Sequence, residues 1–317
     1  WHAIISAHIA HGHHPKSLSL YHSMLWTGFH PSKFMLSGIL KACTCTRSLC
    51  LGMVVHHQTL EYELDSQVVV GSALIALYSK CGILEDARYV FDKLPSRNVI
   101  SWNTMLAGYT HHGDGLLAWG LFEKMQQGRV LPNAITFVCG LKACGNIGCI
   151  IQGFLVHYQI MKDVFESNVA ISNSLIDMYS KLGALTEANS VFKNLANPTL
   201  VSWGVMILGY SNNGQGLVAL NLFEKMQNLN VYPDKVIFLG LLKACASVCA
   251  IEKGRELHHH IVSFGLDVDA VVSNSLLDMY AKCGKLDEAL RVFENLSTCS
   301  VVSWGALIGG YVQHGYA

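Results

Sequence analysis

The chain has 317 residues, is 51% hydrophobic and carries 22 Lys plus Arg against 22 Asp plus Glu, so its formal net charge is zero. A neutral chain lacks the basic surface that usually accompanies non-specific nucleic-acid binding. We find no run of about 18 uninterrupted apolar residues, which argues against a membrane-spanning helix. The apolar residues are better explained by helices that are buried on two sides.

The sequence repeats with a period of 101 residues, since a stretch beginning at Leu74 returns at Leu175 and again at Leu276. Its most distinctive residues recur in register, namely Tyr78, Tyr179 and Tyr280, Gly82, Gly183 and Gly284, Phe91, Phe192 and Phe293, and Trp102, Trp203 and Trp304. Self-similarity at a fixed period is typical of arrays in which each unit packs only on its neighbours. We therefore expect one stacked array rather than the two domains that length alone would suggest.

Each period divides into three units of 35, 35 and 31 residues, and no residue is left over as a linker. We call them Trp units (tryptophan at the fourth position), LKAC units (after the letters they contain) and short units. In chain order the predicted units are partial Trp 1–32, LKAC 33–67, short 68–98, Trp 99–133, LKAC 134–168, short 169–199, Trp 200–234, LKAC 235–269, short 270–300 and partial Trp 301–317. Because the text starts and stops inside a unit, we expect a fragment of a longer array.

Each unit has the pattern of two short helices. In the unit at 68–98, Leu74 and Tyr78 lie on one apolar face, and Gly82 is placed to end that helix in a left-handed conformation. A second apolar face includes Phe91, and Pro95 follows it and cannot continue a helix. Helices of about 10–12 residues are marginal alone. Stacked pairs bury each other's faces, so the pattern predicts an all-α solenoid with a concave groove.

The cysteines and histidines also follow the period. A cysteine that recurs once per period at one helical position is expected to pack in the core, and this applies to Cys43, Cys144 and Cys245. His56, His157 and His258 also recur once per period, which favours packing or capping. Free thiols fit a reducing compartment. The remaining histidines lack the spacing of a closed zinc site with Cys or carboxylate partners. We therefore expect no metal and no cofactor.

Several stretches resemble pentatricopeptide repeats: SWNTMLAGYTHHG, LFEKMQ, ITFVCGLKACG, SNSLIDMYSKLGAL and SWGALIGGYVQHG. The 35–35–31 alternation resembles the plant subclass built of P, long (L) and short (S) motifs, to which the Trp, LKAC and short units correspond. This resemblance covers the whole chain. It implies a right-handed α-solenoid superhelix that binds single-stranded RNA in mitochondria or chloroplasts. In that subclass the array usually addresses a site of cytidine-to-uridine editing.

The resemblance also implies that each unit reads one nucleotide, through its fifth and last residues. The implied pairs are Ser37 with Gln67, Ser72 with Asn98, Asn103 with Asn133, Val138 with Asn168, Asn173 with Thr199, Gly204 with Asp234, Leu239 with Asp269, and Asn274 with Ser300. An Asp side chain only accepts, which suits uracil or guanine, whereas Asn both donates and accepts, which suits adenine or cytosine. Starting at the 68–98 unit, the hypothetical target is A-Y-N-Y-N-N-Y, with cytosine favoured at the first Y.

Two further sets of residues are implied to contact RNA. Second positions of the units resemble the apolar residues that clamp a base between consecutive units, namely Val69, Ile100, Ala170, Val201, Val236, Val271 and Val302. The alternative is that these residues only seal unit interfaces. Position 13 of each short unit is a lysine that the resemblance places on the phosphate backbone: Lys80, Lys181 and Lys282. The alternative there is an ordinary solvated lysine near a helix C-terminus.

No catalytic residues are expected. Editing chemistry uses a zinc-activated water and a general-acid/base Glu in an H-x-E…P-C-x-x-C pattern, and the chain contains neither half of it. Any deaminase, or accessory editing factor, would lie beyond residue 317 or act in trans as a partner. Two other functions stay open: an RNA processing or stability factor without editing, and a protein-binding scaffold of the tetratricopeptide kind. The latter keeps a constant 34-residue unit, so the alternating unit lengths favour RNA.

Overall fold

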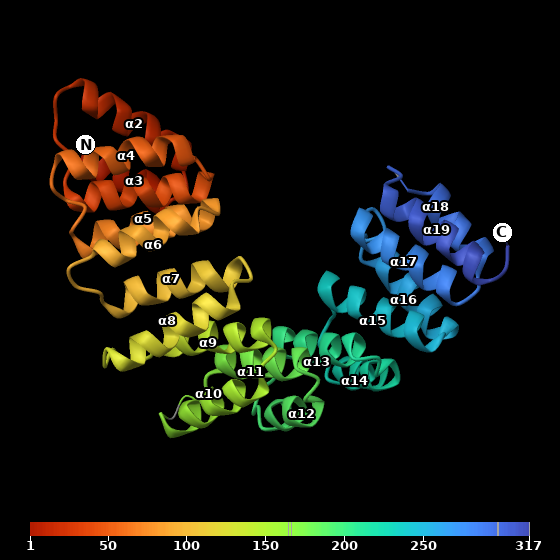
Figure 1. Ribbon diagram of the computed structural model, residues 1–317. Coiled ribbons are helices and arrows are strands. Elements are labelled where there is room, and N and C mark those ends of the chain that lie inside the picture. The colour runs from red at the N-terminus through yellow and green to blue at the C-terminus, as the bar shows by residue number, and fades with distance from the viewer. Residues whose placement is uncertain (164, 166, 297, 317) are drawn as a thin grey trace. The chain divides into compact units, whose positions relative to one another are not determined.

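The computed structural model describes residues 1–163, 165, 167–296 and 298–316. Within these ranges all regular secondary structure is helical, and nineteen α-helices follow one another along the chain (Figure 1). The chain divides into two compact halves, an N-terminal half (Trp1–Ile160) and a C-terminal half (Met161–Ala317). The all-α fold expected from the repeat is confirmed.

The N-terminal half is a stack of helix pairs. Its helices are α1 (His2–Ala10), α2 (His14–Trp26), α3 (Lys33–Thr46), α4 (Leu49–Glu61), α5 (Val68–Cys81), α6 (Leu84–Lys93), α7 (Val99–His111), α8 (Gly115–Gln127), α9 (Ala134–Ile147) and most of α10 (Ile150–Lys162). The odd-numbered helices pack on one another in sequence, α3 on α5, α5 on α7 and α7 on α9. Helices α2, α4, α6 and α8 each pack on the odd-numbered helices before and after them, which gives a stack of helix pairs.

The C-terminal half repeats this arrangement. Its helices are α11 (Val169–Lys181), α12 (Leu185–Lys193), α13 (Leu200–Asn212), α14 (Gly216–Asn228), α15 (Lys235–Val248), α16 (Ile251–Ser263), α17 (Ala270–Lys282), α18 (Leu286–Glu294) and α19 (Val301–Gln313). The odd-numbered helices α11 to α19 again form one layer, each packed on the next. From α3 onward, every odd-numbered helix begins at the first residue of a predicted unit.

The difference between 31 and 35 residues lies in the second helix of the short units. That helix has 10 residues in α6 and 9 in α12 and α18, against 13 in the even-numbered helices of the Trp and LKAC units. The first helix ends where the sequence predicts, because Gly82 closes α5 with a φ of 84° in the left-handed region. Helix α6 ends at Lys93, two residues before Pro95.

Recurring aromatic residues join each short unit to the Trp unit after it. The rings of Phe91 and Trp102 meet edge to face with their centroids 4.9 Å apart. The equivalent distances are 5.0 Å for Phe192 and Trp203 and 4.7 Å for Phe293 and Trp304. Edge-to-face pairs at this separation are worth ~0.5–1.5 kcal/mol beyond the area they bury. The recurring aromatic letters of the repeat are therefore packing residues.

The periodic cysteines and histidines also lie in packed positions. Cys43, Cys144 and Cys245 are fully buried, and burial raises the pKa of Cys43 to about 11 and of Cys144 and Cys245 to about 12. His56 shares a hydrogen bond of 2.7 Å with the Tyr78 hydroxyl, and His258 one of 2.9 Å with Tyr280. Burial lowers the pKa of both imidazoles, which favours their neutral form.

The described residues contain no cluster of three or more His, Cys, Asp or Glu side chains placed to hold a metal ion. Within the same ranges, every helix is too short or too polar to cross a bilayer.

Candidate nucleic-acid interface

The last residue of nearly every unit is the N-cap of the helix that opens the next unit. Its side-chain oxygen accepts a hydrogen bond from a backbone N–H in the first turn, and this holds for Ser32, Asn98, Asn133, Asn168, Thr199, Asp234, Asp269 and Ser300. Only Gln67 caps its helix without a side-chain bond. Ser, Thr, Asn and Asp are the preferred N-cap residues, worth ~1 kcal/mol over Ala. Helix capping therefore accounts for the residue types at these positions independently of any ligand.

The fifth and last residues of the Trp unit at 99–133 lie in contact although 30 residues separate them. Asn103 is only 7% exposed, and its Nδ2 donates to Asn133 Oδ1 at 2.9 Å. The Thr136 hydroxyl donates to Asn103 Oδ1 at 2.7 Å, while the Thr136 backbone N–H donates to Asn133 Oδ1 at 3.1 Å. These bonds hold both amides in fixed orientations. They occupy Asn133 Oδ1, while Asn133 Nδ2 donates no hydrogen bond to another described residue.

The short units show two variants of this arrangement. In the last one, Asn274 Oδ1 accepts from the Ser303 hydroxyl at 2.8 Å, and Ser303 Oγ lies 3.0 Å from Ser300 Oγ. In the middle one, Thr199 Oγ1 lies 3.0 Å from Ser202 Oγ. There the Asn173 Oδ1 is buried and accepts no hydrogen bond from another described residue. The Asn173 amide therefore lacks the bond that Ser303 makes to Asn274.

The second positions of the units expose their apolar side chains. Exposure runs from 46% to 65% at Val69, Ile100, Val201, Val236, Val271 and Val302, and Ala170 is exposed as well. Sealing of unit interfaces therefore accounts for only part of each side chain. The prediction omitted two residues at this position of the LKAC units, Phe34 and Ile135, which are 61% and 59% exposed. Their register would have identified them, because Phe34 and Ile135 lie two residues after the N-caps Ser32 and Asn133.

The three lysines at position 13 of the short units differ in their partners. Lys181 Nζ lies 2.7 Å from Asp177 Oδ2, and Lys282 Nζ lies 2.7 Å from Asp278 Oδ2, one turn earlier on the same helix. Lys80 has Ala76 at the corresponding position, so it lacks this acidic neighbour. All three side chains are exposed. Exposed pairs of this i,i+4 type are worth ~0.3–0.5 kcal/mol, so a phosphate would compete with either aspartate at little cost.

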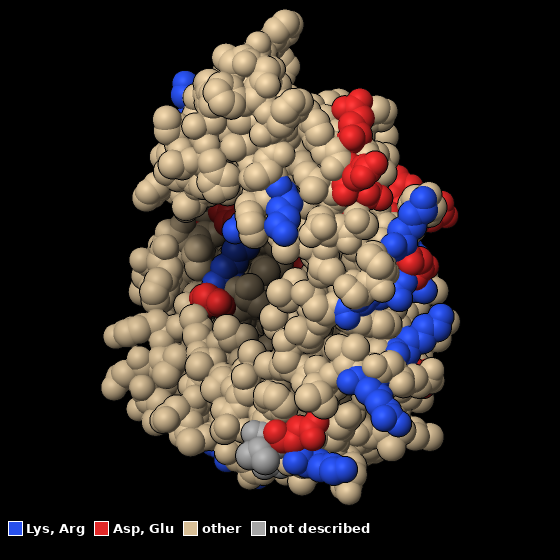
Figure 2. Space-filling model, turned by 90° about the vertical axis from the view of Figure 1, so that its left-hand side faces the viewer, with Lys and Arg blue, Asp and Glu red and all other residues tan. Residues whose placement is uncertain are grey.

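Charge is sparse on the surface that Figure 2 shows, where uncharged residues dominate and both signs of charge occur. This agrees with the formal net charge of zero. A general basic field is therefore absent from that face. Any RNA affinity has to come from local contacts, in which base-edge hydrogen bonds and stacking contribute beside a few lysines.

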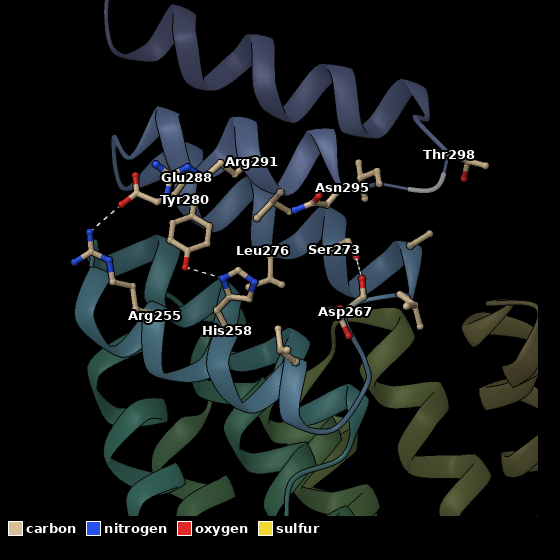
Figure 3. Close-up of a pocket in the computed structure, with 15 residues that line it drawn as sticks. Arg255, His258, Asp267, Ser273, Leu276, Tyr280, Glu288, Arg291, Asn295 and Thr298 are labelled. Atoms are coloured by element: carbon tan, nitrogen blue, oxygen red, sulfur yellow. Dashed lines mark hydrogen bonds and ion pairs between the residues drawn. The ribbon is translucent and has the colours of Figure 1, made fainter.

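The C-terminal half holds a cavity of about 620 Å³ that the sequence did not predict (Figure 3). It lies among α16, α17 and α18. Arg255 pairs with Glu288 at 2.9 Å on its rim, and His258 and Tyr280 lie together on its wall. Arg291 and Asp267 also line it, so two cations face two carboxylates. Its charges balance, and it contains none of the predicted RNA-contacting residues.

One position on the wall of this cavity differs between copies of the short unit: it is Gly71 in the first, Ser172 in the middle and Ser273 in the last. In the first copy, a Cβ on Gly71 would lie 2.5 Å from Leu94 Cδ2, and Leu94 is only 3% exposed. In the last copy Ser273 occupies the Gly71 position, and its hydroxyl donates to the Asp267 carbonyl at 2.6 Å. Leu296, which corresponds to Leu94, is only half-buried. The corresponding leucine is therefore more exposed in the last copy than in the first.

Comparison with known proteins gives consistent matches. A profile described as the PPR repeat matches residues 1–29, 72–99, 171–196, 201–231, 271–301 and 302–317, and one described as the PPR repeat family matches 97–146. A chloroplastic pentatricopeptide repeat-containing protein of Arabidopsis thaliana is 35% identical over 100% of this chain and 51% of its own length. A mitochondrial one from the same plant is 35% identical over 99% of this chain and 30% of its own length.

Among solved structures, the crystal structure of the pentatricopeptide repeat protein PPR10 in complex with an 18-nt psaJ RNA element matches with a TM-score of 0.72. It is 19% identical and covers 99% of this chain and 53% of that one. Identity at this level shows a shared fold. The chain spans about half the length of the relatives it matches first, 46% and 51%.

Proposed function

The chain belongs to the pentatricopeptide repeat family, and we propose that it binds single-stranded RNA with sequence specificity, one nucleotide per unit. The observation that supports this most directly is the contact between Asn103 and Asn133. It places a fifth and a last residue side by side and leaves Asn133 Nδ2 without an acceptor among the described residues. Ile100 and Ile135, at the second positions of this unit and of the next, are 60% and 59% exposed. Two aliphatic side chains and a polar pair suit a base held by its faces and read at its edge.

We extend the same proposal to the other units. Ser72 with Asn98, Asn173 with Thr199, and Asn274 with Ser300 are proposed to read bases in the short units. Gly204 has no side chain, so Asp234 reads alone. In two of the LKAC units, the fifth residues Val138 and Leu239 have no polar side-chain atom, so the last residues Asn168 and Asp269 are proposed to read the base alone. In the remaining LKAC unit, Ser37 and Gln67 are proposed to read it together. The apolar second positions clamp the bases, and Lys80, Lys181 and Lys282 contact phosphates.

Within the family, we propose that the chain belongs to the plant subclass of P, L and S motifs, as one array of the units delimited by sequence. The shortened helices α6, α12 and α18 support this, because they explain a regular 31-residue unit. The proposed site of action is a chloroplast or mitochondrion, as the names of several relatives indicate for those proteins. The array would address a cytidine-to-uridine editing site, with the deaminase or an accessory factor as partner.

Selection from a randomised RNA pool tests the proposed function. The expected result is enrichment of A-Y-N-Y-N-N-Y, with the adenine opposite the 68–98 unit and a pyrimidine opposite the 99–133 unit. The position opposite the Gly204 unit serves as an internal control, since a unit without a fifth side chain is expected to discriminate least. Purine enrichment opposite the 99–133 unit, or no enrichment at any position, would contradict the proposal.

The phosphate contacts are tested by salt dependence. Replacing Lys80, Lys181 and Lys282 together by Gln is expected to flatten the slope of log affinity against log salt by about 2, at ~0.7 per phosphate for single strands. The matched control replaces three lysines on even-numbered helices, Lys124, Lys225 and Lys253, and is expected to leave the slope unchanged. Equal slopes for the first triple variant and the wild type would remove these lysines from the interface.

A further inference from the structure

Two cysteines lie at the C-terminal ends of the neighbouring helices α15 and α17. Cys249 is the C-cap of α15, in the left-handed region with a φ of 52°, and Cys283 is the C-cap of α17. The Cys249 thiol donates to the Lys282 carbonyl at 3.9 Å, and the Cys283 thiol donates to the Cys245 carbonyl at 3.8 Å. Each sulfur thus lies against the backbone of the other's helix end.

The pair occurs in one copy of the repeat. In the first copy Arg47 and Cys81 occupy these positions, and in the middle copy Gly148 and Leu182 do. Arg47 has the same left-handed conformation as Cys249, with a φ of 52°. The backbone geometry is therefore shared between the first and last copies, whereas the two sulfurs are specific to the last. The repeat's packing explains Cys245 and its equivalents and leaves the Cys249–Cys283 pair unexplained.

We propose that Cys249 and Cys283 form a dithiol oxidation site whose substrate is a small-molecule disulfide of the glutathione type. The two thiols differ in solvent exposure, as expected for a reaction in which one thiol attacks the reagent and the other resolves the mixed disulfide. Cys249 is exposed, so it meets the reagent first, whereas Cys283 is half-buried. Burial raises the pKa of the Cys283 thiol to about 11, which disfavours direct attack on a reagent in solution. Cys283 attacks instead the Cys249 sulfur once that sulfur is in a mixed disulfide.

The reaction proceeds by two exchanges. The Cys249 thiolate attacks one sulfur of glutathione disulfide, the S–S bond of the reagent breaks, and one glutathione thiolate leaves. The Cys283 thiolate then attacks the Cys249 sulfur of the mixed disulfide, the mixed bond breaks, and the second glutathione thiolate leaves. Two protein thiols are oxidised to one disulfide, one glutathione disulfide is reduced to two thiols, and the two protons lost by the cysteines end on the leaving groups.

The product would join the C-terminal ends of two consecutive odd-numbered helices. A cross-link between residues 34 apart in sequence restricts the unfolded chain and raises the midpoint of thermal unfolding when native geometry accepts it. The oxidised protein is therefore expected to unfold at a higher temperature than the reduced protein. This consequence is independent of whether the chain binds RNA.

Equilibration of the protein in glutathione redox buffers, followed by alkylation of free thiols and peptide mass spectrometry, tests the proposal. The expected product is a peptide pair linked through Cys249 and Cys283, at least tenfold more abundant than glutathione-modified Cys249. In Cys283→Ser the Cys249 thiol should instead accumulate as the glutathione mixed disulfide. In Cys249→Ser, Cys283 should stay as reduced as the buried Cys245.

A gain-of-function variant makes the test independent of the serine variants. Arg47→Cys places a second thiol opposite Cys81 and is expected to form a second linked peptide under the same buffer. Wild-type protein in which Cys249 carries glutathione without progressing to the linked peptide would overturn the proposal. So would a Cys249–Cys283 pair that stays reduced while the exposed Cys45 and Cys299 react.

Discussion

Gly216→Ala is expected to destabilise the C-terminal half by ~1–3 kcal/mol, the range for forcing extra volume into a packed contact. Gly216 is the first residue of α14, where that helix rests against the last turns of α15. A Cβ there would lie 2.7 Å from the Ala244 carbonyl oxygen and 2.9 Å from Val248 Cγ1. A backbone carbonyl inside a helix cannot swing aside as a side chain does, so α14 and α15 must separate.

Two glycines provide a graded comparison for this substitution. At the equivalent Gly115, the added Cβ would lie 3.1 Å from the Ala143 carbonyl oxygen, so Gly115→Ala should cost less than Gly216→Ala. At Gly120, on the same helix as Gly115, a Cβ meets nothing within 4 Å. Gly120→Ala should stabilise by ~0.5–1 kcal/mol, since alanine loses less backbone entropy in a helix. Thermal unfolding followed by circular dichroism measures the stability of all three variants. An order of destabilisation other than Gly216→Ala, then Gly115→Ala, then Gly120→Ala would contradict the close contact between Gly216 and the Ala244 carbonyl.

The helix-pair architecture was predictable because it depends on local patterns. Gly82 ends a helix and Pro95 follows one whatever the rest of the chain does, and Phe91 recurs with Trp102 because each copy packs in the same way. A periodic sequence repeats the same local pattern three times. Such local patterns are sufficient to predict helix pairs and their stacking, since each unit contacts only its neighbours.

The details that distinguish one unit from another were not predictable in this way. The Asn103–Asn133 contact joins residues on the two ends of a unit, and capping by Asn133 explains the same letter for a different reason. The cavity near Ser273 lies where Leu296 is more exposed than its equivalent Leu94, which depends on the packing of individual side chains. The repeat predicts positions, and side-chain contacts decide what each position does.

Asn133→Asp is expected to shift the base preference of the 99–133 unit from cytosine toward uracil. In the wild type, Asn133 Oδ1 receives the helix-capping bond and the Asn103 bond, and its Nδ2 remains a donor. An Asp at this position keeps an oxygen for both bonds and replaces the donor by an acceptor, which suits the N–H of uracil. We expect a relative change of ~1–3 kcal/mol, the range for one well-placed base-edge contact, measured by titrating RNAs that differ at this nucleotide.

Helix capping and base reading involve different atoms of the same side chain, and this substitution separates them. Asp and Asn are equivalent N-caps, so thermal stability should stay unchanged within about 0.5 kcal/mol. Asn133→Ala, in contrast, removes both the cap and the reader and should lower stability as well as selectivity. If Asn133→Asp leaves both stability and base preference unchanged, Asn133 is only a cap, and the pairing with Asn103 serves the junction between units rather than RNA.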